Sequence, residues 1–340
     1  MRTSVYYLKL FMVLLTLVPP ALSFRLVCYY NRKAAARLSI GRFTPANVAP
    51  NLCTHLIFSP TTERDALVWT LKSKLFILFY SNPDLKTLLA VGDPEGSDSQ
   101  TFTKMVASKT TREKFIDSAV TMINTYGFDG LNLDWRYPTG NANRGKFTSL
   151  CQLRAALNRS LLLTASVSGV KDVIDDSYDV SIIALELDFI NVLTFGFHDS
   201  SEPVTAHHSP LDPPSTDPED PLTTVRGAAL PADKLNMGIA AYGVAFRLFN
   251  SSEGGVGAAT SSTPPEDGCY TEEPGVWSYY EVQPSLGLAL FRTFLDDQGV
   301  PYVVTEGHWV GYDDPQSLNL KVQFLYVADM NCDITKNNCK

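Results

Sequence analysis

Residues 128–138 read FDGLNLDWRYP, and along this stretch apolar and polar side chains alternate. A period of two predicts a β-strand that starts near Gly130 and ends before Pro138, because proline has no backbone N–H to donate to a sheet. Side chains on a strand repeat every two residues, so Asn132, Asp134 and Arg136 share one face. Periodicity alone fits two interpretations, a half-solvated edge strand and a buried strand that carries polar groups for a function.

Similar apolar runs recur along the chain, separated by helical or polar segments. In the segment 111–126, Phe115, Ala119, Met122 and Ile123 have helical spacing and predict an amphipathic helix. Strands alternating with helices indicate an α/β fold, and the number of runs favours a closed (β/α)8 TIM barrel. The alternative, a doubly wound sheet, lacks a glycine-rich phosphate loop after its first strand. The runs predicted as buried parallel strands are Arg25–Tyr30, Thr54–Ser59, Lys86–Gly92, Phe128–Asp134, Leu161–Ser168, Leu187–Phe195 and Leu235–Tyr242.

The stretch 128–138 resembles the active-site strand of glycoside hydrolase family 18, the chitinases and chitinase-like lectins, whose pattern is Asp-Gly-x-Asp-x-Asp-Trp-Glu-Tyr-Pro. Asn132 and Arg136 depart from this pattern, whereas the other specified positions match: Asp129, Gly130, Asp134, Trp135, Tyr137 and Pro138. Shorter matches are spread over the chain at residues 26–30, 52–55, 85–89, 209–211, 237–239, 242–243 and 309–314. The resemblance implies a barrel formed by residues 24–243 and 312–340, with a small α+β domain inserted at 244–311.

Two parts of the expected barrel look short in the sequence. Residues 218–234 contain Pro221, Gly227 and Pro231 and show no helical period where a crossover helix is needed. Residues 316–325 read as the seventh helix, which leaves 326–340 for the eighth strand and helix, and the tryptophan-bearing last strand of the family is not recognisable there. We therefore expect a barrel that is incomplete at the eighth strand, with exposed strand edges.

The resemblance also implies a chemistry that this chain lacks. Family chitinases hydrolyse β-1,4-linked N-acetylglucosamine: a Glu protonates the leaving oxygen, the substrate's own acetamido group attacks, and a neighbouring Asp orients that group. Arg136 stands at the position of the acid, and a guanidinium with a pKa above about 12 has no proton to give at neutral pH. Asn132 replaces a second carboxylate. We expect Arg136 to form a structural ion pair with Asp134, in a protein without catalytic activity.

Other groove positions implied by the resemblance are also changed. Phe195 and Gly196 stand where the family has Tyr and Asp, and the residues 92–94 and 31–33 lack the family's sugar-stacking tryptophans. The positions that still match groove-lining residues, and that we predict to bind carbohydrate, are Tyr29, Trp135, Tyr137, Tyr242 and Glu281. The alternative for the aromatic residues is packing in the core, which we favour for Trp135.

The N-terminus predicts secretion. Arg2 and Lys9 precede the apolar run 10–18, and small residues at 21 and 23 give a cleavage signature, so residues 1–23 are predicted to be a signal peptide. A transmembrane anchor is the alternative, but the run is shorter than the roughly 20 residues needed to span a bilayer. Asn158 and Asn250 lie in glycosylation sequons. The resemblance pairs Cys28 with Cys53, and the remaining cysteines allow three connectivities: Cys151, Cys269, Cys332 and Cys339.

Composition limits the partners. A formal net charge of -8 argues against nucleic acid, and no run of Lys and Arg offers a membrane patch. The spacing of the five histidines indicates no metal site, and we expect no cofactor. We expect a secreted, extracellular monomer that binds chitin-type oligosaccharides weakly, with Arg136 adding affinity for anionic glycans. The alternatives are a hydrolase with a displaced acid such as Asp199 or Glu202, and a protein-interaction or decayed paralogue without glycan binding.

Overall fold

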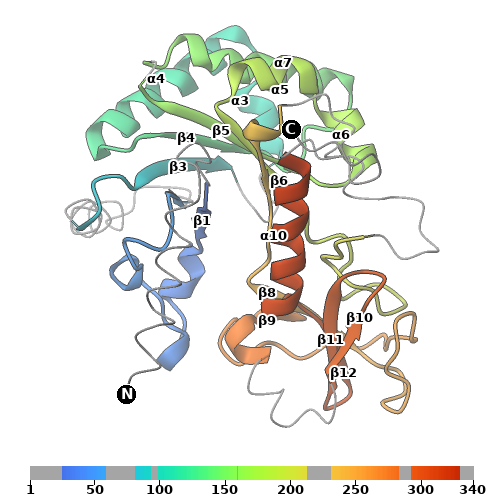
Figure 1. Ribbon diagram of the computed structural model, residues 1–340. Coiled ribbons are helices and arrows are strands. Elements are labelled where there is room, and N and C mark those ends of the chain that lie inside the picture. The colour runs from blue at the N-terminus through green and yellow to red at the C-terminus, as the bar shows by residue number, and fades with distance from the viewer. Residues whose placement is uncertain are drawn as a thin grey trace.

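The structure is a computed structural model that describes residues 25–58, 81–92, 99–158, 160–212, 231–282 and 292–329. Figure 1 shows a curled parallel sheet with helices on its outer face, and a second, smaller sheet beside it. The predicted signal peptide 1–23 and Cys332 and Cys339 lie outside the described residues, as does most of the segment 218–234.

The parallel sheet has its strands in chain order within the described residues. Every neighbouring pair is parallel, as predicted from the alternation of strands and helices. The strands are β1 (Val27–Tyr30), β2 (His55–Phe58), β3 (Lys86–Gly92), β4 (Gly130–Asp134), β5 (Leu162–Ser168), β6 (Phe189–Leu193) and β7 (Leu235–Met237). Each lies inside an apolar run that the sequence predicted. The last run is the exception at its end, because the strand stops at Met237 and Tyr242 belongs to the second sheet.

The helices cover the outer face of this sheet (Figure 1). They are α3 (Ser99–Met105), α4 (Lys109–Tyr126), α5 (Asn141–Cys151), α6 (Lys171–Ser177) and α7 (Val180–Glu186). Short 3₁₀ helices lie at η1 (Arg32–Ala35), η2 (Ser39–Gly41), η3 (Pro45–Asn47), η4 (Gln152–Ala155) and η5 (Ala232–Lys234).

Helix α4 shows why the local sequence folds as it does. The Ser108 hydroxyl accepts from the backbone N–H of Thr111 at 3.1 Å and caps the start, and Gly127 ends the helix at φ 72°, a left-handed conformation that glycine adopts without strain. Ala119 and Ile123 are buried against the sheet, as the helical period predicted. Met122 was placed on the same face but is 38% exposed, because the buried stripe is narrower than predicted.

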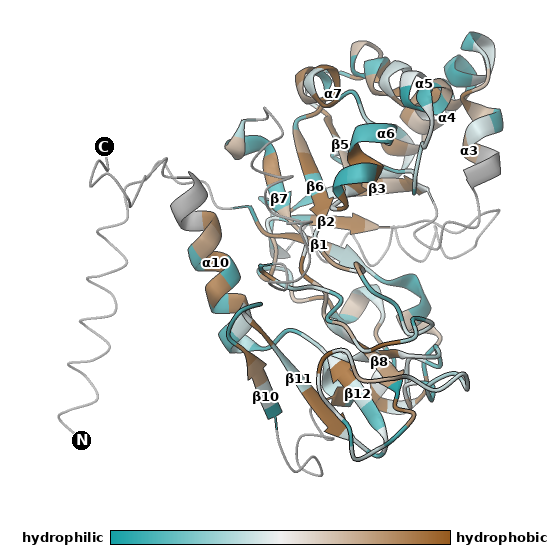
Figure 2. Ribbon diagram, turned by 90° about the vertical axis from the view of Figure 1, so that its right-hand side faces the viewer, coloured by the Kyte–Doolittle hydropathy of each residue, from teal (hydrophilic) through white to brown (hydrophobic). Residues whose placement is uncertain are grey.

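The main core lies between the sheet and these helices. Leu131 and Leu133 of β4 are fully buried, and Phe147 of α5 is fully buried above them. Figure 2 shows the hydrophobic colouring concentrated in strands such as β2 and β6. Because alternate residues of β4 point to opposite faces, the side chain of Asn132, between Leu131 and Leu133, points into the barrel.

The second sheet is antiparallel, with the strand order β10-β11-β12-β8-β9. Its strands are β8 (Tyr242–Arg247), β9 (Val276–Ser278), β10 (Arg292–Leu295), β11 (Val300–Thr305) and β12 (His308–Gly311). It begins at Tyr242, two residues before the boundary expected for the insertion, and ends at the expected residue, Gly311. Helix α10 (Pro315–Asp329) follows and includes the segment predicted to be the seventh helix.

Strands β1 and β7 are the two edges of the described parallel sheet, and Arg25 joins them. Its Nε donates to Oδ1 of Asn236 on β7 at 3.2 Å, its Nη2 donates to the carbonyl of Asp233, and its guanidinium lies 4.9 Å from the ring centroid of Phe189. We call this set of contacts the seam. The sequence predicted a barrel incomplete at the eighth strand. In the described residues, the side chain of Arg25 connects β1 to β7, between which an eighth strand would lie.

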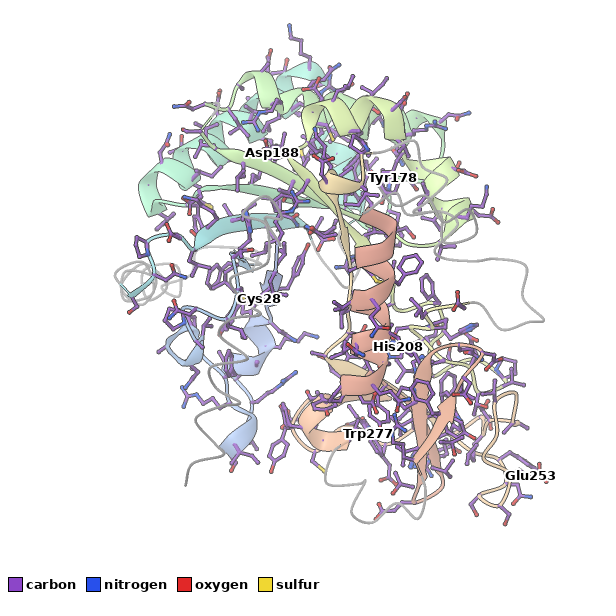
Figure 3. All side chains as sticks on the ribbon, in the orientation of Figure 1. Cys28, Tyr178, Asp188, His208, Glu253 and Trp277 are labelled. Atoms are coloured by element: carbon purple, nitrogen blue, oxygen red, sulfur yellow. A yellow bond between two sulfur atoms is a disulfide. The ribbon has the colours of Figure 1, made fainter. Side chains whose placement is uncertain are left out.

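A disulfide joins Cys28 and Cys53, as the family resemblance predicted, and Figure 3 labels Cys28 at β1. Among the described residues, Cys151 is buried and Cys269 is exposed, and neither forms a disulfide. Asn158 and Asn250 are exposed and therefore accessible to glycosylation, which stays a prediction. No helix among the described residues is long and apolar enough to cross a membrane.

Candidate active site and glycan groove

Arg136 and Asp134 form a bidentate ion pair at the end of β4. Nε of Arg136 donates to Oδ1 of Asp134 at 2.8 Å, and Nη2 donates to Oδ2 at 3.1 Å. The Asp134 residue is 4% exposed, and the Arg136 side chain 20%. Burial disfavours the charge of Arg136, but the hydrogen bonds and charge of Asp134 outweigh it and raise the pKa of the guanidinium. The ion pair predicted from the strand period is confirmed, and Arg136 stays a cation at any working pH.

Asn132 lies inside the barrel in a network of neutral groups. Thr164 Oγ1 donates to its Oδ1 at 2.8 Å, and its Nδ2 donates to Ser166 Oγ at 3.0 Å. Asn191 Nδ2 donates to the same Oδ1 at 3.4 Å, and Asn191 Oδ1 accepts from Asn236 Nδ2 at 2.9 Å. Hydrogen bonds between amide and hydroxyl groups thus connect β4 to β7 across the interior of the barrel. The members of this network can hold one another in place, but none is an acid that can protonate a leaving oxygen.

Tyr29 carries the network to β1. Its hydroxyl lies 2.9 Å from Ser166 Oγ on β5, across the barrel, while the residue as a whole is 43% exposed. Burial of the hydroxyl raises its pKa strongly. Tyr29 therefore presents a fixed, partly exposed ring at the inner face of the sheet.

Two further tyrosines lie close to the ion pair. The charge of Arg136 acts on both Tyr137 and Tyr242, and burial raises the pKa of each hydroxyl. The ring of Tyr242 packs edge-to-face on Phe195 at 6.2 Å and is stacked on His208 at 5.3 Å. The structure thus brings Tyr29, Tyr137 and Tyr242 together around Asp134 and Arg136, at the strand ends that the sequence analysis selected. Flat, partly apolar faces around a polar floor are suited to sugar rings.

The comparisons with known proteins decide the family. The family model described as Glycosyl hydrolases family 18 matches residues 25–333. The chain belongs to glycosyl hydrolase family 18. It is 36% identical to Chitotriosidase-1 of Mus musculus over 334 residues, covering 88% of this chain and 70% of that protein. It is 38% identical to Chitinase-3-like protein 2 of Homo sapiens over 340 residues, covering 92% of this chain and 86% of that protein.

A solved structure of the family gives the same fold. It superposes with a TM-score of 0.84 at 37% sequence identity and covers 90% of each chain. That protein is human YKL-39, described as a pseudo-chitinase with retained chitooligosaccharide binding properties. Family 18 thus contains relatives of this chain named as chitinases and a structural neighbour named as a pseudo-chitinase.

Asp129, the first residue of the family 18 motif, has a structural position. Its Oδ2 accepts from both the backbone N–H and the hydroxyl of Thr87, at 2.8 and 3.2 Å, which fastens β4 to β3 at the start of the two strands. At the other end, Gly92 passes so close to β4 that an added Cβ would lie 1.8 Å from the Asp134 carbonyl oxygen. These contacts hold the position of Asp134 from both ends of the strand.

Trp135 and Glu281 were predicted to bind carbohydrate. In the structure each contacts other protein groups instead. Trp135 is 1% exposed and is stacked on Phe102 of α3 at 5.3 Å, so the core-packing alternative is the one supported. Glu281 accepts backbone N–H bonds from Tyr270, Thr271 and Ser278 and is 9% exposed. We exclude both from the groove, because one faces the helical layer and the other fastens the loop before β9.

The displaced acids considered as an alternative are engaged in local contacts. Glu202 lies 2.8 Å from Nδ1 of His198 and accepts the backbone N–H of Asp199. Hydrogen bonds from the hydroxyl and backbone of Ser201 lower the pKa of Asp199, so this carboxylate is ionised near neutral pH. An ionised carboxylate cannot act as a general acid.

One buried polar cluster was missed by the sequence analysis. The rings of His207 and His208, adjacent in sequence, are stacked with centroids 5.5 Å apart, and both are buried. Figure 3 labels His208, and the ring of His207 lies against Trp309 of β12. Burial lowers the pKa of His207 to about 4 and lowers that of His208 well below the ordinary value of a histidine. Nearby, Lys321 and Asp313 form a fully buried ion pair at 2.7 Å. Among the described residues, no group of three or more potential ligands could hold a metal ion.

Proposed function

We propose that this protein is a secreted, catalytically inactive member of family 18 that binds chitin-type oligosaccharides through the open end of its barrel. The observation that carries the proposal is the bidentate Asp134–Arg136 pair at the position where family 18 chitinases hold their acid. Secretion rests on the predicted signal peptide 1–23 and on the Cys28–Cys53 disulfide, which persists in oxidising compartments.

The ion pair opposes hydrolysis in two ways. Arg136 supplies no proton, and loss of a general acid costs on the order of 10²–10⁴ in rate. Its cation also lies where positive charge develops on the sugar, which raises the energy of the transition state. Asp134 accepts from two nitrogens of the guanidinium, so its oxygens are directed at Arg136 instead of at an acetamido group.

Binding requires less than catalysis. Human YKL-39 is named as a pseudo-chitinase with retained chitooligosaccharide binding, and by analogy the inner tyrosines support the same activity here. Tyr29 offers a partly exposed ring fixed through its hydroxyl, and Tyr137 and Tyr242 lie near the ion pair. The residues 31–33 and 92–94 lack the tryptophans expected from the family, and each lost stacking face costs on the order of 1 kcal/mol. We therefore propose affinities in the high micromolar range or poorer, with Arg136 favouring anionic glycans.

Calorimetric titration with chitin oligosaccharides of increasing length, paired with a fluorogenic chitobioside assay, tests the proposal. We expect heat of binding that grows with length, and no turnover. Tyr29→Ala should weaken binding several-fold, whereas Phe249→Ala, at a 79% exposed site in the bend after β8, should not. Turnover that Asp134→Ala abolishes would refute the inactive site. Absence of binding at millimolar oligosaccharide would refute the lectin function and favour a protein-interaction role.

A further inference from the structure

The first part of the described chain has a charge opposite to that of the whole protein. Residues 25–58 contain five basic residues and no Asp or Glu, although the chain carries a formal net charge of -8. The basic residues are Arg25, Arg32, Lys33, Arg37 and Arg42. Arg25 is at the seam, and the other four belong to residues 31–43, which we call the basic loop. Figure 1 shows this loop as the blue segment after β1, extending away from the parallel sheet.

Large apolar side chains stand between these cations in solvent. Leu38 is 67% exposed, Ile40 is 80% exposed and Phe43 is 43% exposed. Arg32 and Arg42 are also exposed. A single exposed leucine is ordinary on a protein surface, but three apolar residues within six positions, flanked by cations, form a patch.

The loop is fastened so that these side chains stay exposed. Phe43 N–H donates to the Ala34 carbonyl at 2.7 Å, which closes the loop on itself, and Tyr30 donates to the Phe43 carbonyl at 3.1 Å. Gly41 is buried against Tyr270, where an added Cβ would lie 2.6 Å from the Cβ of that tyrosine. These contacts hold the backbone of the loop while leaving Leu38 and Ile40 at its surface.

The second sheet supports the same orientation. Lys33 pairs with Glu273 at 2.9 Å, and Arg37 donates to the hydroxyl of Tyr280 at 3.1 Å. The loop is therefore anchored to the loop preceding β9 and to the helical turn after it. Arg32 and Arg42, which have no ion pair among the described residues, remain exposed with the apolar tips.

We propose that the basic loop binds the surface of an anionic lipid bilayer. Leu38 and Ile40 enter the headgroup region, and Arg32 and Arg42 lie beside lipid phosphates and carboxylates. A sulfated polysaccharide would attract the arginines equally but would gain nothing from Leu38 and Ile40, whereas a lipid surface uses both. The sequence showed no long Lys/Arg run because, apart from the adjacent Arg32 and Lys33, the cations are separated by small and apolar residues. The inference does not rest on glycan binding.

Vesicle flotation of the mature protein tests this site. The vesicles contain phosphatidylcholine alone or mixed with phosphatidylserine, at low and physiological salt. We expect binding to the mixed vesicles only. Arg32→Gln with Arg42→Gln should weaken it about 25-fold, since each cation near an anionic surface contributes about fivefold. Leu38→Ser with Ile40→Ser should weaken it by about tenfold or more, because apolar insertion is lost.

Matched controls separate the site from general effects. Lys104→Gln with Lys109→Gln removes two exposed cations on α3 and α4, and Leu185→Ser removes an 81% exposed apolar side chain on α7. Neither should change binding. No binding of the wild type to phosphatidylserine vesicles overturns the proposal. It is also overturned if the Leu38/Ile40 variant binds like the wild type while the arginine variant does not, which would indicate a polyanion site; dextran sulfate beads would then retain the wild type.

Discussion

Arg136→Met should destabilise the protein by leaving a buried carboxylate without its partner. Asp134 is 4% exposed, and both its oxygens accept from Arg136. Breaking a buried ion pair by removing one member costs about 3–5 kcal/mol. The Arg136 side chain is 20% exposed, so water can reach part of the pair and the lower end of that range applies. For a chain of this size, about 3 kcal/mol corresponds to a fall in the thermal midpoint of roughly 4–5 °C.

The double variant Asp134→Asn with Arg136→Met separates lost packing from an unpaired charge. An amide at position 134 needs no cation, so we expect most of the loss to be recovered, with a coupling energy between the two sites of at least about 1.5 kcal/mol. Urea unfolding with a shared m-value measures this. Lys109→Met, which breaks the exposed Lys109–Glu113 pair at 3.7 Å, is the control and should cause little change. The reasoning fails if Arg136→Met costs less than about 1 kcal/mol, or if the double variant is less stable than the single one.

Three further predictions concern activity, pH and the seam. Asn132→Asp with Arg136→Glu should not reach the turnover of a family chitinase in the chitobioside assay, because Phe195 and Gly196 still lack the polar groups of the family; full turnover would contradict this. Stability should fall as pH drops from about 6.5 towards 4, because the unfolded chain protonates His207 and His208 before the folded protein does; the fall should be smaller by about 3 kcal/mol in His207→Phe, in which His208 alone still titrates. Arg25→Ala should increase aggregation on heating, measured by light scattering, since β1 and β7 lose the contact between their edges; unchanged scattering would count against the seam.

The parallel sheet was predictable because its signals are local. Buried parallel strands are continuous apolar runs, and each run contained the observed strand. The Asp134–Arg136 pair was also predictable, since two residues on one strand face are adjacent whatever the surroundings. The same alternation places Trp135 on the face opposite to Asp134 and Arg136, and its position in the core agrees with this.

The remaining features depend on contacts between residues distant in sequence. The stacking of His207 on His208 is set by Trp309, Tyr312 and Pro301, about a hundred residues away, which no local pattern reveals. Glu281 matched a groove position in the family, but its carboxylate is taken by backbone N–H groups of a loop whose path the sequence does not specify. The extra strand at Tyr242 was merged with β7 because both segments are apolar.

The seam also imposes an order on the synthesis of the chain. Arg25 and Asn236 are 211 residues apart, so Arg25 leaves the ribosome long before its partner. Each new parallel strand can pair with the strand made just before it, and the sheet can therefore grow from β1 towards β6 while translation continues. During this whole interval the outer edge of β1 has no neighbour, and only the arrival of Asp233 and Asn236 fastens the first residues of the sheet to the last.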